Sequence, residues 1–135
     1  MVSTRLQHVL VLTDDLDATK AFYCDVLGLA VGERPPLPFP GYWLYSDGVA
    51  CLHVAERASY DAHTAGMGLP AKASPVDHVA FEADEHELLL ERLAAAGVEV
   101  TTNAVPGSGV RQFFFDDPNG ARVELIVPER TTEIR

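Results

Sequence analysis

The stretches QHVLVL at residues 7–12 and DHVAFE at residues 77–82 decide the fold of this chain, because they show that one pattern occurs twice. Both are short runs rich in Val, Leu or Phe, residue types that favour β-strands. Both are followed by acidic pairs, at residues 14–15 and 84–85, of the kind that suits the start of a helix. The sequence therefore predicts a strand and then a helix in each copy.

A helical pattern comes next in both copies. Apolar residues recur at helical spacing over residues 16–27 and again over residues 89–96. Gly28 and Gly97 follow these stretches, where a C-cap glycine is expected. Short strands are then expected at residues 29–31 and 98–100.

Each copy closes with an antiparallel hairpin. Asp-Gly joins the strands of the first hairpin, and Asp-Pro-Asn-Gly joins those of the second. Proline presets one turn position, and glycine tolerates positive φ. The four strands are expected at residues 41–46, 49–56, 110–116 and 121–127.

The predicted fold class is α+β, with two βαβββ modules in a single domain spanning residues 1–135. The first module covers about residues 6–56 and the second about residues 76–127. Between them, residues 57–75 are expected to form an irregular linker, because glycines and prolines interrupt regular structure there.

Composition limits the classes of partner. Ten basic and twenty acidic residues give a formal net charge of −10. Such a charge repels phosphate backbones and anionic lipid, so we expect no nucleic acid and no membrane among the partners. No apolar run approaches the ~20 residues needed to cross a bilayer, and the first residues lack the apolar stretch of a signal peptide. A cytoplasmic protein is therefore expected.

Metal-binding residue types interrupt the apolar strand sequence at matching positions of the two copies. His8 aligns with His78, and His53 aligns with Glu124. A buried carboxylate in a strand costs several kcal/mol unless it is paired or bound to a metal. Side chains alternate faces along a strand, so one ligand per strand is what a site built on a sheet would supply. We expect these four residues to bind one divalent metal ion.

The donor set narrows the choice of metal. Three imidazoles and one carboxylate suit Fe, Ni, Mn, Co or Zn better than Ca or Mg. Three of these ligands with open positions match the two-histidine, one-carboxylate arrangement of iron oxygenases. Four ligands in an octahedral field leave two positions for water or for a bidentate substrate.

Longer motifs surround these residues. They are His8 followed by DDL at residues 14–16 and AFYCDVLGL at 21–29, DHVAF at 77–81, and DDPNG at 116–120 leading into VEL at 123–125. Over about residues 6–127 the chain resembles the vicinal oxygen chelate superfamily, which includes glyoxalase I, extradiol dioxygenases, methylmalonyl-CoA epimerase, fosfomycin-resistance thiol transferases and bleomycin-binding proteins.

This resemblance implies paired modules that form a U-shaped mixed sheet around a divalent metal. It implies a homodimer in which each site draws ligands from both subunits, so that His8 of one chain could join His78 and Glu124 of the other. The expected chemistry is chelation of a small-molecule substrate through neighbouring oxygens, with the metal acting as a Lewis acid.

The sequence departs from two members of this superfamily. Glyoxalase I carries Glu or Gln where this chain has His53, although His53 or Glu124 could still act as the catalytic base. Well-known extradiol dioxygenases are about twice as long. The aromatic walls of a pocket that suits an apolar ligand, with an arginine for an anionic group, are expected from Tyr45, Trp43, Phe39, Phe113 and Arg111.

Three functions stay open at this point. Glyoxalase-like lyase or isomerase chemistry is favoured, because the length matches and four ligands are present. A ring-cleaving extradiol-type dioxygenase with Fe(II) is the second reading. The third is a non-enzymatic protein that binds a drug or metabolite, as bleomycin-resistance proteins do; those members typically lack the metal ligands. His63 and His86 are expected to be exposed and outside the site.

Overall fold

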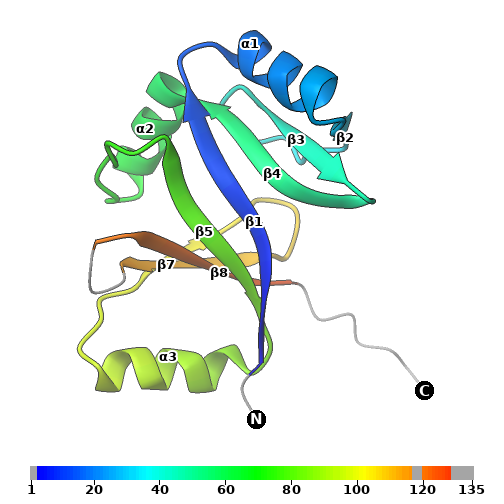
Figure 1. The fold of residues 1–135 in the computed structure, drawn as a ribbon. Coiled ribbons are helices and arrows are strands. Elements are labelled where there is room, and N and C mark those ends of the chain that lie inside the picture. The colour runs from blue at the N-terminus through cyan, green and yellow to red at the C-terminus, as the bar shows by residue number, and fades with distance from the viewer. Residues whose placement is uncertain (1–2, 117–119, 129–135) are drawn as a thin grey trace. The chain divides into compact units, whose positions relative to one another are not determined.

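The computed structural model describes residues 3–116 and 120–128, and it confirms the α+β prediction. Two βαβββ modules contribute the eight described strands of a mixed sheet (Figure 1). Contacts divide the chain into two units. The first unit is Gln7–Val79, and the second is Met1–Leu6 with Ala80–Arg135. Both divisions fall inside a strand.

The first unit contains a half-sheet in the order β2-β3-β4-β1. The pairs β2–β3 and β3–β4 are antiparallel, whereas β1 and β4 run parallel. Helices α1 and α2 both contact β4 (Figure 1). The elements are β1 (Thr4–Thr13), α1 (Leu16–Ala21), the π-helical segment η1 (Phe22–Val26), β2 (Ala30–Gly32), β3 (Gly41–Ser46), β4 (Val49–Glu56) and α2 (Arg57–Gly66).

The predicted first helix begins as expected and changes its winding. Asp15 is its N-cap, and its side chain accepts a hydrogen bond from the amide of Ala18. The helix continues as η1 and ends before Gly28, whose φ of 79° is left-handed. The amide of Leu29 still bonds to the carbonyl of Tyr23, so β2 begins one residue later than predicted.

A helix occupies the first half of the segment that was predicted to be an irregular linker. Helix α2 runs from Arg57 to Gly66, so the expectation of irregular structure is wrong there. The glycines and prolines that suggested a linker begin only at Gly66. The helix buries Tyr60 and Thr64, four residues apart on one face. Its Tyr60 packs in a core cluster with Leu10, Leu12 and Ala55, which Phe39 joins.

The second unit repeats the pattern with the strand order β5-β8-β7-β6. The predicted strand at 98–100 is wrong, because the amide of Val98 still bonds to the carbonyl of Leu93 and caps the helix. The second hairpin forms as predicted, and its turn residues 117–119 lie outside the described residues. The elements are β5 (Val76–Ala83), α3 (His86–Ala95), β6 (Thr101–Ala104), β7 (Arg111–Asp116) and β8 (Arg122–Val127).

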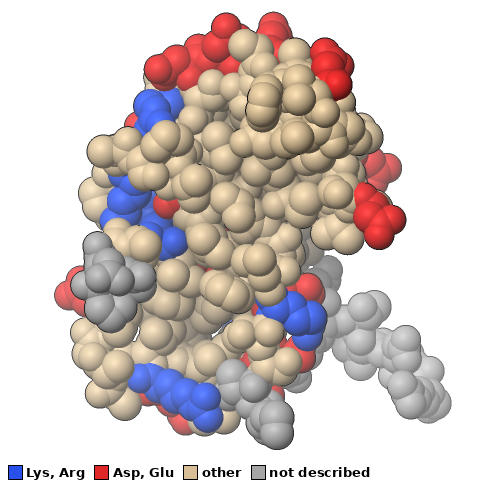
Figure 2. Space-filling view, viewed as in Figure 1, with Lys and Arg blue, Asp and Glu red and all other residues tan. Residues whose placement is uncertain are grey.

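The surface of the first unit is acidic around α1. Asp14, Asp15 and Asp17 are exposed there, and acidic side chains gather over this helix (Figure 2). Within the described ranges, no helix has the length and apolar character that a membrane span requires.

Candidate metal centre

Two buried imidazoles meet inside the first unit. Strand β1 supplies His8, which is 4% exposed, and β5 supplies His78, which is 5% exposed. Their Nε2 atoms lie 3.2 Å apart. The repeat therefore brings its two aligned histidines together, as the sequence predicted, and it does so within one chain.

The opposite nitrogen of each ring is held by the residue that precedes it. His8 Nδ1 lies 2.7 Å from the amide oxygen of Gln7, and His78 Nδ1 lies 2.9 Å from Asp77 Oδ2. With a hydrogen on each Nδ1, both Nε2 lone pairs point at each other. Two such lone pairs repel each other unless a cation or a proton lies between them. Two imidazole nitrogens that bind the same metal ion face each other in this way. The residues present fit a metal ion.

His53 lies in a stack of three rings on neighbouring strands. Its ring is 4.0 Å from that of Trp43 and 3.7 Å from that of His8, measured between centroids. Strand pairing explains this stack. Trp43 of β3 stands directly opposite His53, and His8 lies two residues before Leu10, the β1 residue opposite His53, so that it points to the same face of the strand. Burial, with the neighbouring His8 and His78, lowers the pKa of His53 to about 2. The ring is therefore neutral at neutral pH and keeps a lone pair.

Glu124 lies on β8 in the second unit and is 2% exposed. Gln112 Nε2 of β7 donates to Glu124 Oε2 at 3.1 Å, and Asn103 Nδ2 of β6 donates to Gln112 Oε1 at 2.7 Å. This chain of hydrogen bonds orients the carboxylate from two neighbouring strands. His8 and His78 of the first unit and Glu124 of the second are each buried and are of the residue types that bind a divalent metal ion.

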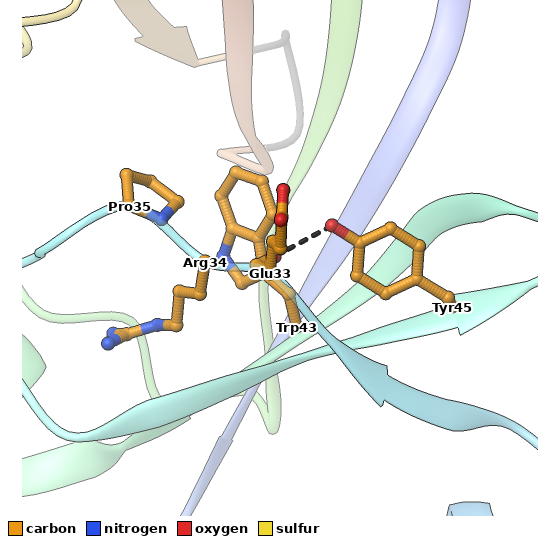
Figure 3. Close-up of a pocket in the computed structure, with 5 residues that line it drawn as sticks. All are labelled: Glu33, Arg34, Pro35, Trp43 and Tyr45. Carbon is orange, nitrogen blue, oxygen red and sulfur yellow. Dashed lines mark hydrogen bonds between the residues drawn. The ribbon is translucent and has the colours of Figure 1, made fainter.

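An open pocket of about 460 Å³ in the first unit includes two of the predicted substrate-binding residues, Trp43 and Tyr45. Glu33, Arg34 and Pro35 complete its lining. The Tyr45 hydroxyl donates to the carbonyl of Glu33 at 2.7 Å (Figure 3). Trp43, which lines this pocket, also stacks on the ring of His53.

The other predicted pocket residues lie elsewhere. Phe39 packs against the core cluster of the first unit, and Phe113 is buried in the core of the second. Arg111 Nη2 donates to His86 Nε2 at 3.0 Å. His86 is 5% exposed, so the expectation that it is exposed is wrong. His63 is half-buried beside Phe39.

Sequence reasoning missed the groups that hold the ligands. Gln7 and Asp77 each precede an aligned histidine, so their places in the repeat were visible. On an ideal strand, however, adjacent side chains point to opposite faces, and no contact would be predicted. Gln112 had a weaker signal, a polar residue before three phenylalanines.

Comparisons with known proteins agree with this fold. A mitochondrial methylmalonyl-CoA epimerase of Bos taurus is 37% identical over 127 residues, which cover 90% of this chain and 73% of that protein. Glyoxylase I 4 of Arabidopsis thaliana is 30% identical over 128 residues, or 90% of this chain and 70% of that protein. A solved hypothetical protein of Bacillus halodurans shares the fold, with a TM-score of 0.71 at 16% identity over 98% of this chain and 99% of its own.

The family match covers nearly all of the described chain. The model described as the Glyoxalase/Bleomycin resistance protein/Dioxygenase superfamily matches residues 5–125. That range includes both aligned histidines, His53 and Glu124. The chain therefore belongs to this superfamily, the vicinal oxygen chelate proteins that its repeated strands and motifs resemble.

Proposed function

We propose that this chain is a divalent-metal-dependent enzyme that moves a proton on a small molecule with two neighbouring oxygens, in glyoxalase-like lyase or isomerase chemistry. One observation carries the proposal: two buried imidazoles face each other through Nε2 at 3.2 Å, and each Nδ1 lies against a side-chain oxygen. This pairing presents two imidazole nitrogens at one point.

The residues then divide the work. His8, His78 and Glu124 hold the ion, which when bound acts as a Lewis acid on the substrate oxygens. His53 is the candidate fourth ligand or base. Its low pKa keeps it neutral, and its stack between Trp43 and His8 fixes its plane. Glu124 is the alternative base, with one oxygen held by Gln112.

The relatives support proton transfer in particular. Methylmalonyl-CoA epimerase and Glyoxylase I 4 are the named relatives. An epimerase inverts a stereocentre, which at a carbon bearing hydrogen requires a base to remove a proton and an acid to return it. We propose that Trp43 and Tyr45 flank the substrate during this transfer, because both line the pocket and Trp43 stacks on His53. Phe39, Phe113 and Arg111 have no such support from the structure.

A ring-cleaving dioxygenase is the second candidate. Two histidines and one carboxylate are the donor set of non-haem Fe(II) oxygenases, and His8, His78 and Glu124 supply it. In that case His53 would not be a ligand. Oxygen uptake separates the two candidates, because ring cleavage consumes dioxygen and proton transfer does not.

We also propose a homodimer. Phe22, Val26, Leu27, Val31 and Val49 of the first unit have 50–68% of their surface exposed. Exposed apolar residues in such number indicate a protein interface. Because the two histidines meet within one chain, a site shared between subunits would take Glu124 rather than His8 from the second chain.

The test begins with elemental analysis of tag-free protein purified without oxygen, beside the variants His78→Ala and Glu124→Ala. We expect about one divalent ion per chain, lost in both variants. The loaded protein is then assayed with methylmalonyl-CoA and with the hemithioacetal of methylglyoxal and glutathione, in deuterium oxide. Deuterium entering either substrate supports proton transfer. Bound iron with oxygen uptake on catechols supports the dioxygenase, and absence of metal after reconstitution leaves a binding protein.

A further inference from the structure

We propose that Asp77 is a positioning residue for the metal centre. Held by Tyr60, Asp77 fixes the tautomer of His78 that has an unprotonated Nε2, the form that binds a metal ion. Gln7, in contrast, leaves His8 able to change tautomer. The inference rests on the proposed metal function and goes beyond it, because it assigns different roles to two histidines that the repeat makes equivalent.

The contact between Asp77 and His78 sets the direction of the hydrogen bond at Nδ1. Asp77 Oδ2 lies 2.9 Å from His78 Nδ1, and its side chain is completely buried. The Tyr60 hydroxyl donates to the same oxygen at 3.1 Å and lies 3.5 Å from Nδ1. A carboxylate has no hydrogen to donate. With an ionised Asp77 and a neutral ring, the hydrogen sits on His78 Nδ1, and Nε2 keeps its lone pair.

The contact between Gln7 and His8 allows either tautomer of the His8 ring. Gln7 offers an amide, which presents either an acceptor oxygen or a donor nitrogen after a half-turn of the amide group. In the metal-free protein, His8 can carry its hydrogen on Nε2 and donate it across 3.2 Å to His78 Nε2. When an ion binds, the hydrogen moves to His8 Nδ1 and the amide presents its oxygen. The ion thus takes the place of the hydrogen between the Nε2 atoms of His8 and His78.

Tyr60 ties this arrangement to the core. It lies on α2, is 4% exposed, and packs with Leu10, Leu12 and Ala55. Its hydroxyl is held in place by the packing of its own ring, so it restrains Asp77 without depending on the ion. A carboxylate bonded to the far nitrogen also makes an imidazole a stronger ligand, an effect that a neutral amide provides more weakly.

Nitrogen NMR of the metal-free protein tests the tautomers directly. We expect His78 to show a protonated Nδ1 and a bare Nε2 in the unchanged chain, in Tyr60→Phe and in Asp77→Asn, whose amide oxygen can still accept. In Asp77→Leu we expect a substantial population with the hydrogen on Nε2. A protonated His78 Nε2 in the unchanged chain, or an unchanged tautomer in Asp77→Leu, overturns the proposal.

Cobalt(II) titration separates the effect of the Asp77 charge from the effect of its hydrogen-bonding oxygen. We expect Asp77→Asn to bind cobalt about tenfold more weakly and Asp77→Leu up to about a hundredfold more weakly. Glu82→Gln is the matched control, since it removes a carboxylate from the same strand that pairs with exposed Arg5. Equal affinity of Asp77→Asn and the unchanged chain overturns the role of the charge. If the unchanged chain binds no cobalt, the proposed function fails, and the nitrogen signals still decide the role of Asp77.

Discussion

At the scale of single residues, His53 shows how packing sets the charge of a side chain. Its ring is stacked between those of Trp43 and His8, where water cannot solvate an imidazolium. Burial is the main cause of its pKa of about 2, and the nearby imidazoles add to it. The neutral form is therefore built into the fold, as a ligand or a base requires.

This charge state predicts a pH dependence of stability in the metal-free protein. The pKa of an unfolded histidine is about 6.5 and that of folded His53 is about 2, so between these values only the unfolded chain binds the proton. Stability must then fall as the pH drops below about 6.5, by about 2 kcal/mol at pH 5 from this residue. Denaturant unfolding at pH 7.5 and pH 5 measures it. His53→Gln should lose correspondingly less stability over that interval, and parallel losses would contradict the assignment.

Glu124 is oriented by a chain of amides, and a second prediction follows at this scale. Gln112→Leu removes one hydrogen bond to the Glu124 carboxylate and keeps a side chain of similar size at position 112. We expect metal affinity to fall about tenfold or more, as is typical when a ligand loses an outer partner. Asn103→Ala acts one hydrogen bond further away and should have a smaller effect. Isothermal titration with zinc measures both, and an equal loss in the two variants would argue for a general loss of structure.

At the scale of elements, the β3–β4 hairpin places Trp43 opposite His53 and so builds the stack. Asp47 and Gly48 form its turn with φ values of 51° and 77°, as the Asp-Gly signal predicted. Gly41 begins β3 with its backbone so close to β4 that a Cβ there would lie 2.3 Å from the carbonyl of Val54. The register of this pair depends on that close approach.

Two glycine substitutions should therefore have opposite effects on stability. Gly41→Ala forces β3 away from β4 and should cost about 1–3 kcal/mol, as overpacking does. Gly66→Ala at the end of α2 meets no atom within 4 Å and has no positive φ, so it should stabilise the helix by up to about 1 kcal/mol. Thermal unfolding of the two variants is the measurement. A stable Gly41→Ala protein would show that the hairpin can shift its register.

At the scale of the whole molecule, the proposed dimer makes a prediction that needs no structure of the complex. Co-expressed chains carrying His8→Ala and Glu124→Ala each lack one ligand. If a site takes Glu124 from the second subunit, the mixed dimer keeps one intact site and should bind about one ion per two chains. If every site lies within one chain, none is intact. Metal analysis of the doubly tagged mixed dimer distinguishes these cases, and each variant expressed alone is the control.

Much of the architecture followed from the sequence. The repeated strands, the Asp15 cap, the glycine ends of both helices and the first hairpin were read from near neighbours along the chain. The errors lay where a local signal was absent or was overridden. The glycines and prolines from residue 66 onward concealed α2, and the strand predicted at 98–100 does not form because the backbone of Val98 still closes a helix.

The sequence alone determined the fold class, the family resemblance and the four residues of the predicted site. Periodicity and turn chemistry are local patterns, and the repeat is found by comparing one half of the sequence with the other. Only the tertiary structure decided which ring nitrogens face each other, that Trp43 and His8 enclose His53, and that Asp77 and Tyr60 hold His78. Most of these contacts join residues of different strands, or of helix α2 and a strand. They depend on strand order, register and side-chain rotamers, which are set by the packing of the folded chain.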